Sequence, residues 1–287
     1  VCVWGGEDNE PPIYGKVFIS LKPTNALKFK QSEKSAIARN IIKSRNLISI
    51  TPEIVDPEYI YLIINCNVSY DQSKTNLTPK AMQQLVSTYI TTYGDLYLDK
   101  FDRNFRYSNF LSYIDDINPS ILSSDTDINL MKTIDPRFNI SSNYTINYNN
   151  QLYHPIDSYT SIVTSNGFGY IDSDGEDVDC YLEDDGLGTV KIYKLIDQEK
   201  IYVKESAGTI DYDTGKLVLV NFRPTRLSNI IDSEIKITVI PNKRDVISKR
   251  NQIVTIDYNN ITVTCSPESI RSDPYSSGAN FPYSTGT

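Results

Sequence analysis

The sequence predicts an α+β fold: an amino-terminal mixed sheet with helices on one face, followed by smaller β-hairpin-rich domains. Before residue 150, stretches with the spacing of strands alternate with stretches with the spacing of helices. After residue 150, short alternating stretches are separated by Asn, Asp and Gly turns, which is typical of hairpins. We expect four parts: an α+β domain at 1–150, a β-hairpin-rich domain at 151–228, a small α+β or β segment at 229–265, and a flexible tail at 266–287.

The first expected elements are a strand, a helix and a second strand. Lys16–Leu21 alternates polar and apolar side chains and predicts a strand. A helix is expected at about 33–46, with Ala36 and Ile41 among its buried residues. Glu58–Tyr70 is dense in β-branched and aromatic residues and apolar on both faces in its middle, so we expect a central strand there.

A pair of helices is expected next. Thr78 and Pro79 mark a helix start, because the hydroxyl can cap the first turn and proline fits the first helical position. Apolar residues then recur at helical spacing as far as Gly94, where we expect the helix to end. A second helix is expected over Tyr107–Ile114, and a strand over 121–133.

The second half of the chain reads as strands and turns. The clearest hairpin pairs Thr209–Tyr212 with Leu217–Asn221 across an Asp-Thr-Gly turn. Ile235–Ile240 predicts a further strand, and Gln252–Tyr258 is expected to return over two asparagines as a hairpin with Ile261–Cys265.

Composition limits the function classes. The 287 residues are 39% apolar, enough for a sizeable core, and their net charge of −8 argues against a nucleic-acid binder. No apolar run approaches the roughly 20 residues of a membrane span, so membrane insertion is not expected. The four cysteines are scattered without a CxxC pair, which fits a reducing cytosol. With His154 as the single histidine, we expect no zinc site and no cofactor.

An acidic stretch at 172–185 is the sharpest chemical candidate. Its alternating carboxylates suggest a calcium loop, but counting from Asp172 the sixth position holds Asp177 instead of the glycine of an EF-hand. A solvated acidic hairpin is therefore the favoured interpretation, and no metal ligand is assigned. Nucleophilic catalysis would have to use His154, for which packing is favoured, so we assign no catalytic residue and expect no enzyme.

Two stretches carry a family resemblance. Residues 3–12 (VWGGEDNEPP) lead into 14–23 (YGKVFISLKP), and residues 208–222 read GTIDYDTGKLVLVNF. Together they resemble the central and carboxy-terminal portion of the baseplate wedge proteins of T-even-type contractile-tailed bacteriophages, within the wider baseplate J-like family. The part with which family members join their core wedge bundle would precede Val1.

The resemblance implies a structural subunit of the virion. It would sit in the tail baseplate and be assembled in the host cytoplasm. It would associate with itself as a dimer or ring and with other baseplate wedge proteins, and the ring would rearrange on host attachment to trigger sheath contraction. No catalytic residue is carried over from the family.

Interfaces are therefore the functional sites to expect. The chain has 21 tyrosines, which give large contact area with a polar end. We predict that Trp4, Tyr212, Val218 and Val220 contribute to an interface, the last two in an isologous dimer contact. The alternative left open is a sugar- or receptor-binding module of a phage tail, in which Tyr-rich hairpins form the ligand groove; a hydrolase built on a pair of acids is a more distant one.

Overall fold

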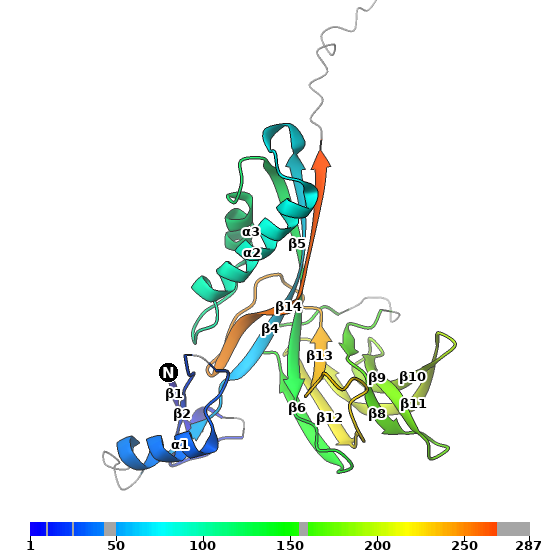
Figure 1. Ribbon diagram of the computed structural model, residues 1–287. Helices are drawn as coiled ribbons and strands as arrows, with labels where there is room; N and C mark the ends of the chain where they lie inside the picture. Colours follow the sequence, from blue (N-terminus) through cyan, green and yellow to red (C-terminus); the bar gives the residue numbers. More distant parts are fainter. Residues whose placement is uncertain (10, 25, 43–49, 155–159, 269–287) are drawn as a thin grey trace, which may run out of the picture.

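The computed structural model describes residues 1–287 except 10, 25, 43–49, 155–159 and 269–287 (Figure 1). Strands make up 46% of it and helices 18%, in three sheets and three α-helices among the described residues. The fold is thus mostly β, and the predicted α+β class is wrong. The physical reason is that the helices at Pro79–Tyr97 and Tyr107–Asp115 cover a single sheet, which is completed by strands from the carboxy-terminal half of the chain.

The amino-terminal residues form a small sheet of their own. Its order is β1 (Cys2–Gly5), β2 (Lys16–Ser20) and β3 (Thr51–Val55), which confirms the strand expected at Lys16. Helix α1 (Gln31–Ile37) continues into a wider turn at Ala38–Ile42, and neither contains a buried residue. The expected burial of Ala36 and Ile41 is wrong, and residues 43–46 of that expected helix lie outside the described residues.

A five-stranded sheet runs along the length of the molecule. Its order is β14 (Gln252–Glu268), β4 (Glu58–Asp71), β5 (Ile121–Ile134), β13 (Ile235–Val239) and β7 (Val163–Ser165). Strands β4, β5 and β13 confirm the expectations. The hairpin expected at 252–265 is wrong: β14 is one strand, parallel to β4, with a single irregularity in register between Ile256 and Ile261.

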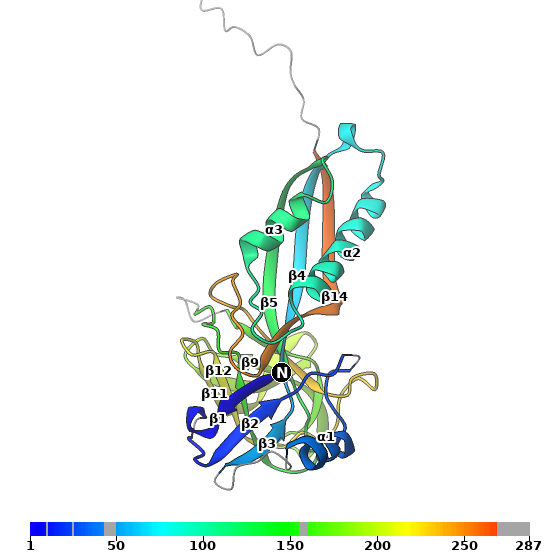
Figure 2. The same ribbon diagram turned by 90° about the vertical axis from the view of Figure 1, so that its left-hand side faces the viewer.

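Helices α2 (Pro79–Tyr97) and α3 (Tyr107–Asp115) cover one face of the long strands β4, β5 and β14 (Figure 2). Thr78 caps α2 as expected, since its Oγ accepts a hydrogen bond from Ala81 N at 3.2 Å. The helix does not stop at Gly94. That residue is buried, and a Cβ there would lie 2.9 Å from Tyr258 Oη, so the glycine allows β14 to approach α2 closely. Of the described helices, none unites the length and the apolar character that crossing a membrane demands.

The core beneath these helices comes from every second residue of β4. Its inward side chains are fully or almost fully buried, while their neighbours are half-buried or exposed. They pack against the inward faces of α2 and α3, in a cluster that includes Ile60, Leu62, Ile64, Val68, Met82, Val86, Ile90, Phe110 and Ile114. This alternation is that of a strand with one covered face, so the opposite face of the sheet is open.

A six-stranded antiparallel sheet forms the third unit. Its order is β6 (Ser142–Asn147), β12 (Lys216–Phe222), β11 (Glu199–Asp211), β10 (Thr189–Ile196), β9 (Asp177–Asp184) and β8 (Phe168–Ile171). The hairpin expected at 209–221 is confirmed, with Thr209 opposite Val218 and Ile210 opposite Leu217.

The sheets draw on strands from distant parts of the chain. β6 lies before residue 150 but joins the six-stranded sheet, whereas β13 and β14 join β4 and β5. The predicted four-part division at 150, 228 and 265 stays a prediction. The expected tail begins inside β14, which ends at Glu268, and residues 269–287 lie outside the described residues.

Candidate interface surfaces

Trp4 lies half-buried in the amino-terminal sheet. Its ring stacks on Phe18 with centroids 5.6 Å apart, and its Nε1 donates to Asn9 Oδ1 at 2.9 Å. It lines a cleft of about 710 Å³ between the small sheet and the body of the molecule. Trp4 is therefore placed at a junction between two structural units.

This junction is formed largely by polar contacts around the two-residue connection from β3 to β4, Asp56 and Pro57. Lys34 Nζ lies 2.8 Å from Asp56 Oδ2, and Asn251 Nδ2 donates to Asp56 O at 3.1 Å. Gln252, on the body side, donates from Nε2 to Asn147 O at 2.8 Å, but its buried Oε1 has no partner. The small sheet thus meets the body without a shared apolar core of the kind found under α2 and α3.

Tyr212 is buried, at 8% exposure, so its ring lies inside the six-stranded unit. It stacks on His154 with centroids 4.4 Å apart, and its hydroxyl donates to Asp184 Oδ2 at 2.7 Å. The His154 Nε2 lies 3.1 Å from Gly186 O. Tyr212 and His154 therefore join the turn after β9 to the end of the β11 strand by packing and hydrogen bonds.

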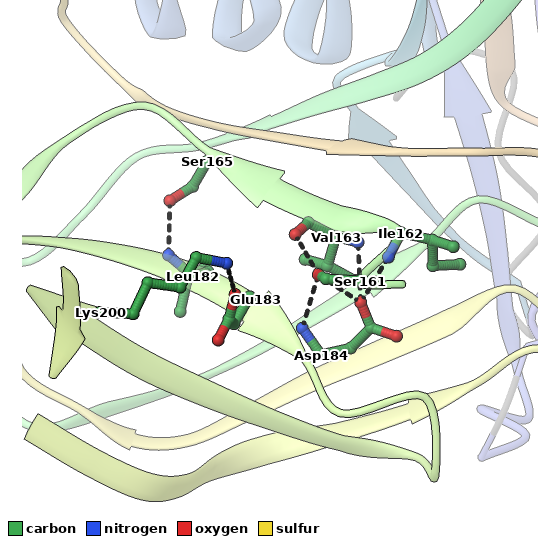
Figure 3. Close-up of polar contacts among 8 residues, drawn as sticks. All are labelled: Ser161, Ile162, Val163, Ser165, Leu182, Glu183, Asp184 and Lys200. Atoms are coloured by element: carbon green, nitrogen blue, oxygen red, sulfur yellow. Dashed lines mark hydrogen bonds and ion pairs between the residues drawn. The ribbon is translucent and has the colours of Figure 1, made fainter. Parts of the chain in front are cut away.

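Asp184 anchors the segment that leads into β7 (Figure 3). Its Oδ1 accepts hydrogen bonds from Ser161 Oγ at 2.7 Å, Ile162 N at 2.7 Å and Val163 N at 2.9 Å. The carboxylate is 4% exposed and accepts a bond on each oxygen. It therefore connects the six-stranded sheet to the edge strand of the five-stranded sheet.

Four other acids of the stretch have a cationic partner: Asp172, Asp177, Asp179 and Glu183. Lys194 donates to Asp172, which holds the pKa of that carboxyl below its usual value. Arg226 bridges Asp177 and Asp179, and hydrogen bonds from Ser228 and Arg226 lower the Asp179 pKa. Within the described residues, no group of three or more His, Cys, Asp or Glu side chains is arranged to hold a metal ion.

The outer face of β9, β10 and β11 carries tyrosines covered by lysines. Tyr193 and Tyr202 face each other across β10 and β11. Lys200 Nζ lies 4.7 Å from the centre of the Tyr193 ring, and Lys191 Nζ lies 4.8 Å from that of Tyr202. Lys200 also pairs with the buried Glu183 (Figure 3). Because ammonium groups already lie over these rings, the face does not favour sugar stacking.

Val218 and Val220 lie on β12, between β6 and β11 in the sheet. Val218 is half-buried and Val220 is 43% exposed. The structure does not bring the four predicted interface residues together: Trp4 is at the junction, Tyr212 is inside, and Val220 is the one that presents substantial apolar surface. Their role as an interface stays a prediction.

The cysteines are poor nucleophiles in this fold. Cys66, Cys180 and Cys265 are buried, and all four thiols are free. Burial raises the pKa of Cys180 to about 12 and that of Cys265 to about 11, which keeps them protonated at neutral pH.

Sequence reasoning missed two features. The first is a set of contacts made by Arg244, which lies 2.7 Å from Asp125, 3.3 Å from Asp127 and over the ring of Tyr107. The acids at alternate positions of β5 are the sequence pattern that could have indicated a basic partner. The second is the outer edge of β14, whose carboxy-terminal half has no backbone partner within the described residues apart from β4. The Thr- and Val-rich sequence of this edge predicts a strand, but the two asparagines before it favour a hairpin.

Comparisons with known proteins match the first half of the chain. Residues 1–55 match the family model for baseplate structural protein gp6, C-terminal domain I. Residues 58–133 match the model for baseplate structural protein gp6, C-terminal domain III. The boundary between the two matches falls at Asp56 and Pro57, the connection from β3 to β4.

A curated relative agrees with these matches. The chain is 28% identical over 138 residues to the baseplate wedge protein gp6 of Enterobacteria phage T4. The aligned part covers 48% of this chain but 21% of the relative, so the chain spans about a fifth of that protein's length. The findings support a baseplate wedge protein; they do not extend to the wider baseplate J-like family.

Proposed function

We propose that this chain is a structural subunit of the baseplate wedge of a contractile phage tail. Its location is the tail baseplate of the virion, and it is assembled in the host cytoplasm. The observation that carries the proposal is the pair of adjacent family matches, to residues 1–55 and 58–133. They divide the chain at the same two-residue connection that separates the small sheet from the long strands.

The role is structural rather than catalytic. The family matches suggest it, and the side chains that could do chemistry are committed to packing: the His154 ring stacks on Tyr212, and Cys180 is buried with its pKa raised. The alternative of a sugar- or receptor-binding module is not favoured, since Lys191 and Lys200 lie over the tyrosine rings.

The finer proposal concerns assembly. The subunit associates with itself and with other wedge proteins into a ring that rearranges on host attachment and triggers sheath contraction. Such a rearrangement requires folded units that keep their cores while the contacts between them change. The separate sheets and the polar junction at Asp56 support this division into units.

The experiment is immunogold electron microscopy of virions of the encoding phage, with antibodies raised against this chain. We expect gold at the distal end of the tail, at the baseplate, and none on the capsid. Antibodies against a capsid protein serve as the control. Gold on the capsid, or virions left unlabelled by antibodies that bind the denatured protein from the same particles, would refute the proposal.

A further inference from the structure

Six strands form the edges of the three sheets, and β14 is much longer than the other five. The other five, β1, β3, β6, β7 and β8, contain 3 to 6 residues, whereas β14 contains 17. Proteins keep exposed edges short because unpaired N–H and C=O groups accept a strand from another chain. β8 is covered as well: Gly169 N donates to Arg226 O, and Thr225 N donates to Gly169 O, each at 2.9 Å.

The first half of β14 is protected and the second half is not. Asp99 N donates to Val254 O at 2.9 Å, so the chain after α2 covers the beginning of the strand. From Ile261 to Ser266 the strand is in regular register with β4, and no other described segment pairs with its outer side. We call this run the open edge. It is about 20 Å long at roughly 3.3 Å per residue.

The open edge lacks the usual devices against strand pairing. Its six residues contain no charge and no proline; Pro267 and Glu268 follow them at the end of β14, and the one irregularity of the strand lies before them. Thr262, Val263 and Thr264 are good strand formers. Ile261 and Val263 face the helix layer and, with the polar side of α2, line a shallow hollow beside the edge. Figure 2 shows β14 as the outermost strand of the long sheet.

We propose that the open edge of β14 pairs antiparallel with the same edge of a second copy, across a two-fold axis near Val263. This inference deepens the self-association in the proposed function and rests on it. The paired strands join the two long sheets into one, with α2 of both copies on the same face.

Two observations favour a second copy over another partner. First, the protein carries a net charge of −8, which opposes the association of two copies, and the uncharged open edge adds no like charge to the contact. Second, antiparallel pairing about Val263 is self-complementary: Thr262 meets Thr264 of the other copy on the open face, and Ile261 meets Cys265 on the helix side. Threonine pairs and apolar pairs are both favourable cross-strand neighbours.

The test is sedimentation velocity of the chain and of a Thr262→Lys, Thr264→Lys double variant over a wide concentration range. The pairing places each lysine opposite a lysine of the second copy, and like charges directly opposite are destabilising. We expect the parent to dimerise and the variant to need at least tenfold higher concentration. The matched control is Thr145→Lys, Asn147→Lys, which adds the same charge at two exposed positions of β6. Circular dichroism melts check that each variant is folded.

A second variant reports the contact directly. With cysteine at both 262 and 264, opposed Cα atoms would lie about 4.5 to 5.5 Å apart, within disulfide range. We expect a covalent dimer under mild oxidation and none in the parent, whose Cys66, Cys180 and Cys265 are buried and whose half-buried Cys2 lies on β1, away from the open edge of β14. A disulfide can form whether the two-fold axis lies at residue 262, 263 or 264, because two of the introduced cysteines lie opposite each other in each of these registers.

The outcomes separate this inference from the proposed function. A lysine variant that is folded and dimerises like the parent overturns the pairing of β14, and so does a parent that stays monomeric at every concentration. Dissociation by Val220→Glu but not by the lysine pair would assign the contact to the β12 face instead. The immunogold experiment does not depend on these three results. If the β14 contact is refuted, the baseplate location is still tested by immunogold labelling.

Discussion

Removal of the Asp184 carboxylate should destabilise the protein more than any change of an exposed acid. In Asp184→Ala, the N–H groups of Ile162 and Val163 lose their acceptor, and both residues are at most 1% exposed. The Tyr212 hydroxyl loses its acceptor as well. A buried donor left without a partner costs about 1–3 kcal/mol, so the three together cost about 3–5 kcal/mol if the segment relaxes in part.

Asparagine at the same position separates charge from hydrogen bonding. In Asp184→Asn the amide oxygen can still accept from the two main-chain N–H groups, and the Tyr212 hydroxyl can turn to accept from the new NH₂. The expected loss is therefore about 1–2 kcal/mol, the difference between charged and neutral hydrogen bonds. Asp213→Ala is the matched control, because Asp213 is exposed and accepts a single side-chain bond from Gln151; it should change stability by about 0.5 kcal/mol or less.

The assay is urea unfolding followed by circular dichroism, with the free energy of unfolding extrapolated to water. A loss of 3–5 kcal/mol is a large part of the roughly 5–15 kcal/mol typical of a folded protein, so Asp184→Ala should unfold at clearly lower urea. If Asp184→Ala and Asp213→Ala unfold within about 0.5 kcal/mol of each other, the network in Figure 3 does not anchor the segment and the reasoning fails.

Three further predictions follow from single contacts. Gly208→Ala should cost about 1–3 kcal/mol in the same assay, because the new Cβ would lie 2.0 Å from Val218 O across the hairpin. Arg226→Ala should cost less than about 1 kcal/mol, since the Arg226 pairs with Asp177 and Asp179 are partly exposed, and a larger loss would contradict that reading. The hydrogen bond from Lys194 lowers the pKa of Asp172 below 3.8 in the folded protein, so the ionised carboxylate stabilises the fold above pH 3.8. This stabilisation is lost as the pH falls through the pKa that Asp172 has in the folded state. Replacement of its partner in Lys194→Met should move acid unfolding, measured as melting temperature between about pH 5 and pH 2, to higher pH.

Elements specified by neighbouring residues were predictable from the sequence. The start of α2 depends on Thr78 and Pro79, and the 209–221 hairpin depends on its Asp-Thr-Gly turn, where Asp211 accepts from the N–H groups of Asp213 and Thr214. These contacts span at most a few residues, so a local pattern contains all the information that they need.

Features that depend on distant partners were not predictable. The contacts of Tyr212 are an example, because nothing nearby in the sequence shows that its ring lies against His154 and that its hydroxyl donates to Asp184. Gly94 looked like a helix end because the reason for a glycine there is Tyr258, which belongs to a strand far along the chain. In both cases the residue type is informative, but the contacts that explain it come from residues distant in the sequence.

The strand β14 shows why this matters for function. Two strand-like runs separated by Asn259 and Asn260 have the local signature of a hairpin, and a hairpin would pair its own edges. In the structure both runs pair with β4 instead, because β4 is long enough to match them along its 14 residues. The chain passes the two asparagines in a bulge, because four residues of β14, 257–260, separate the pairs Ile256–Leu62 and Ile261–Ile64, where β4 has one residue. It then resumes pairing with β4, so the residues that would have closed a hairpin present an unpaired edge. The misassigned turn and the proposed contact with a second copy thus have the same physical origin.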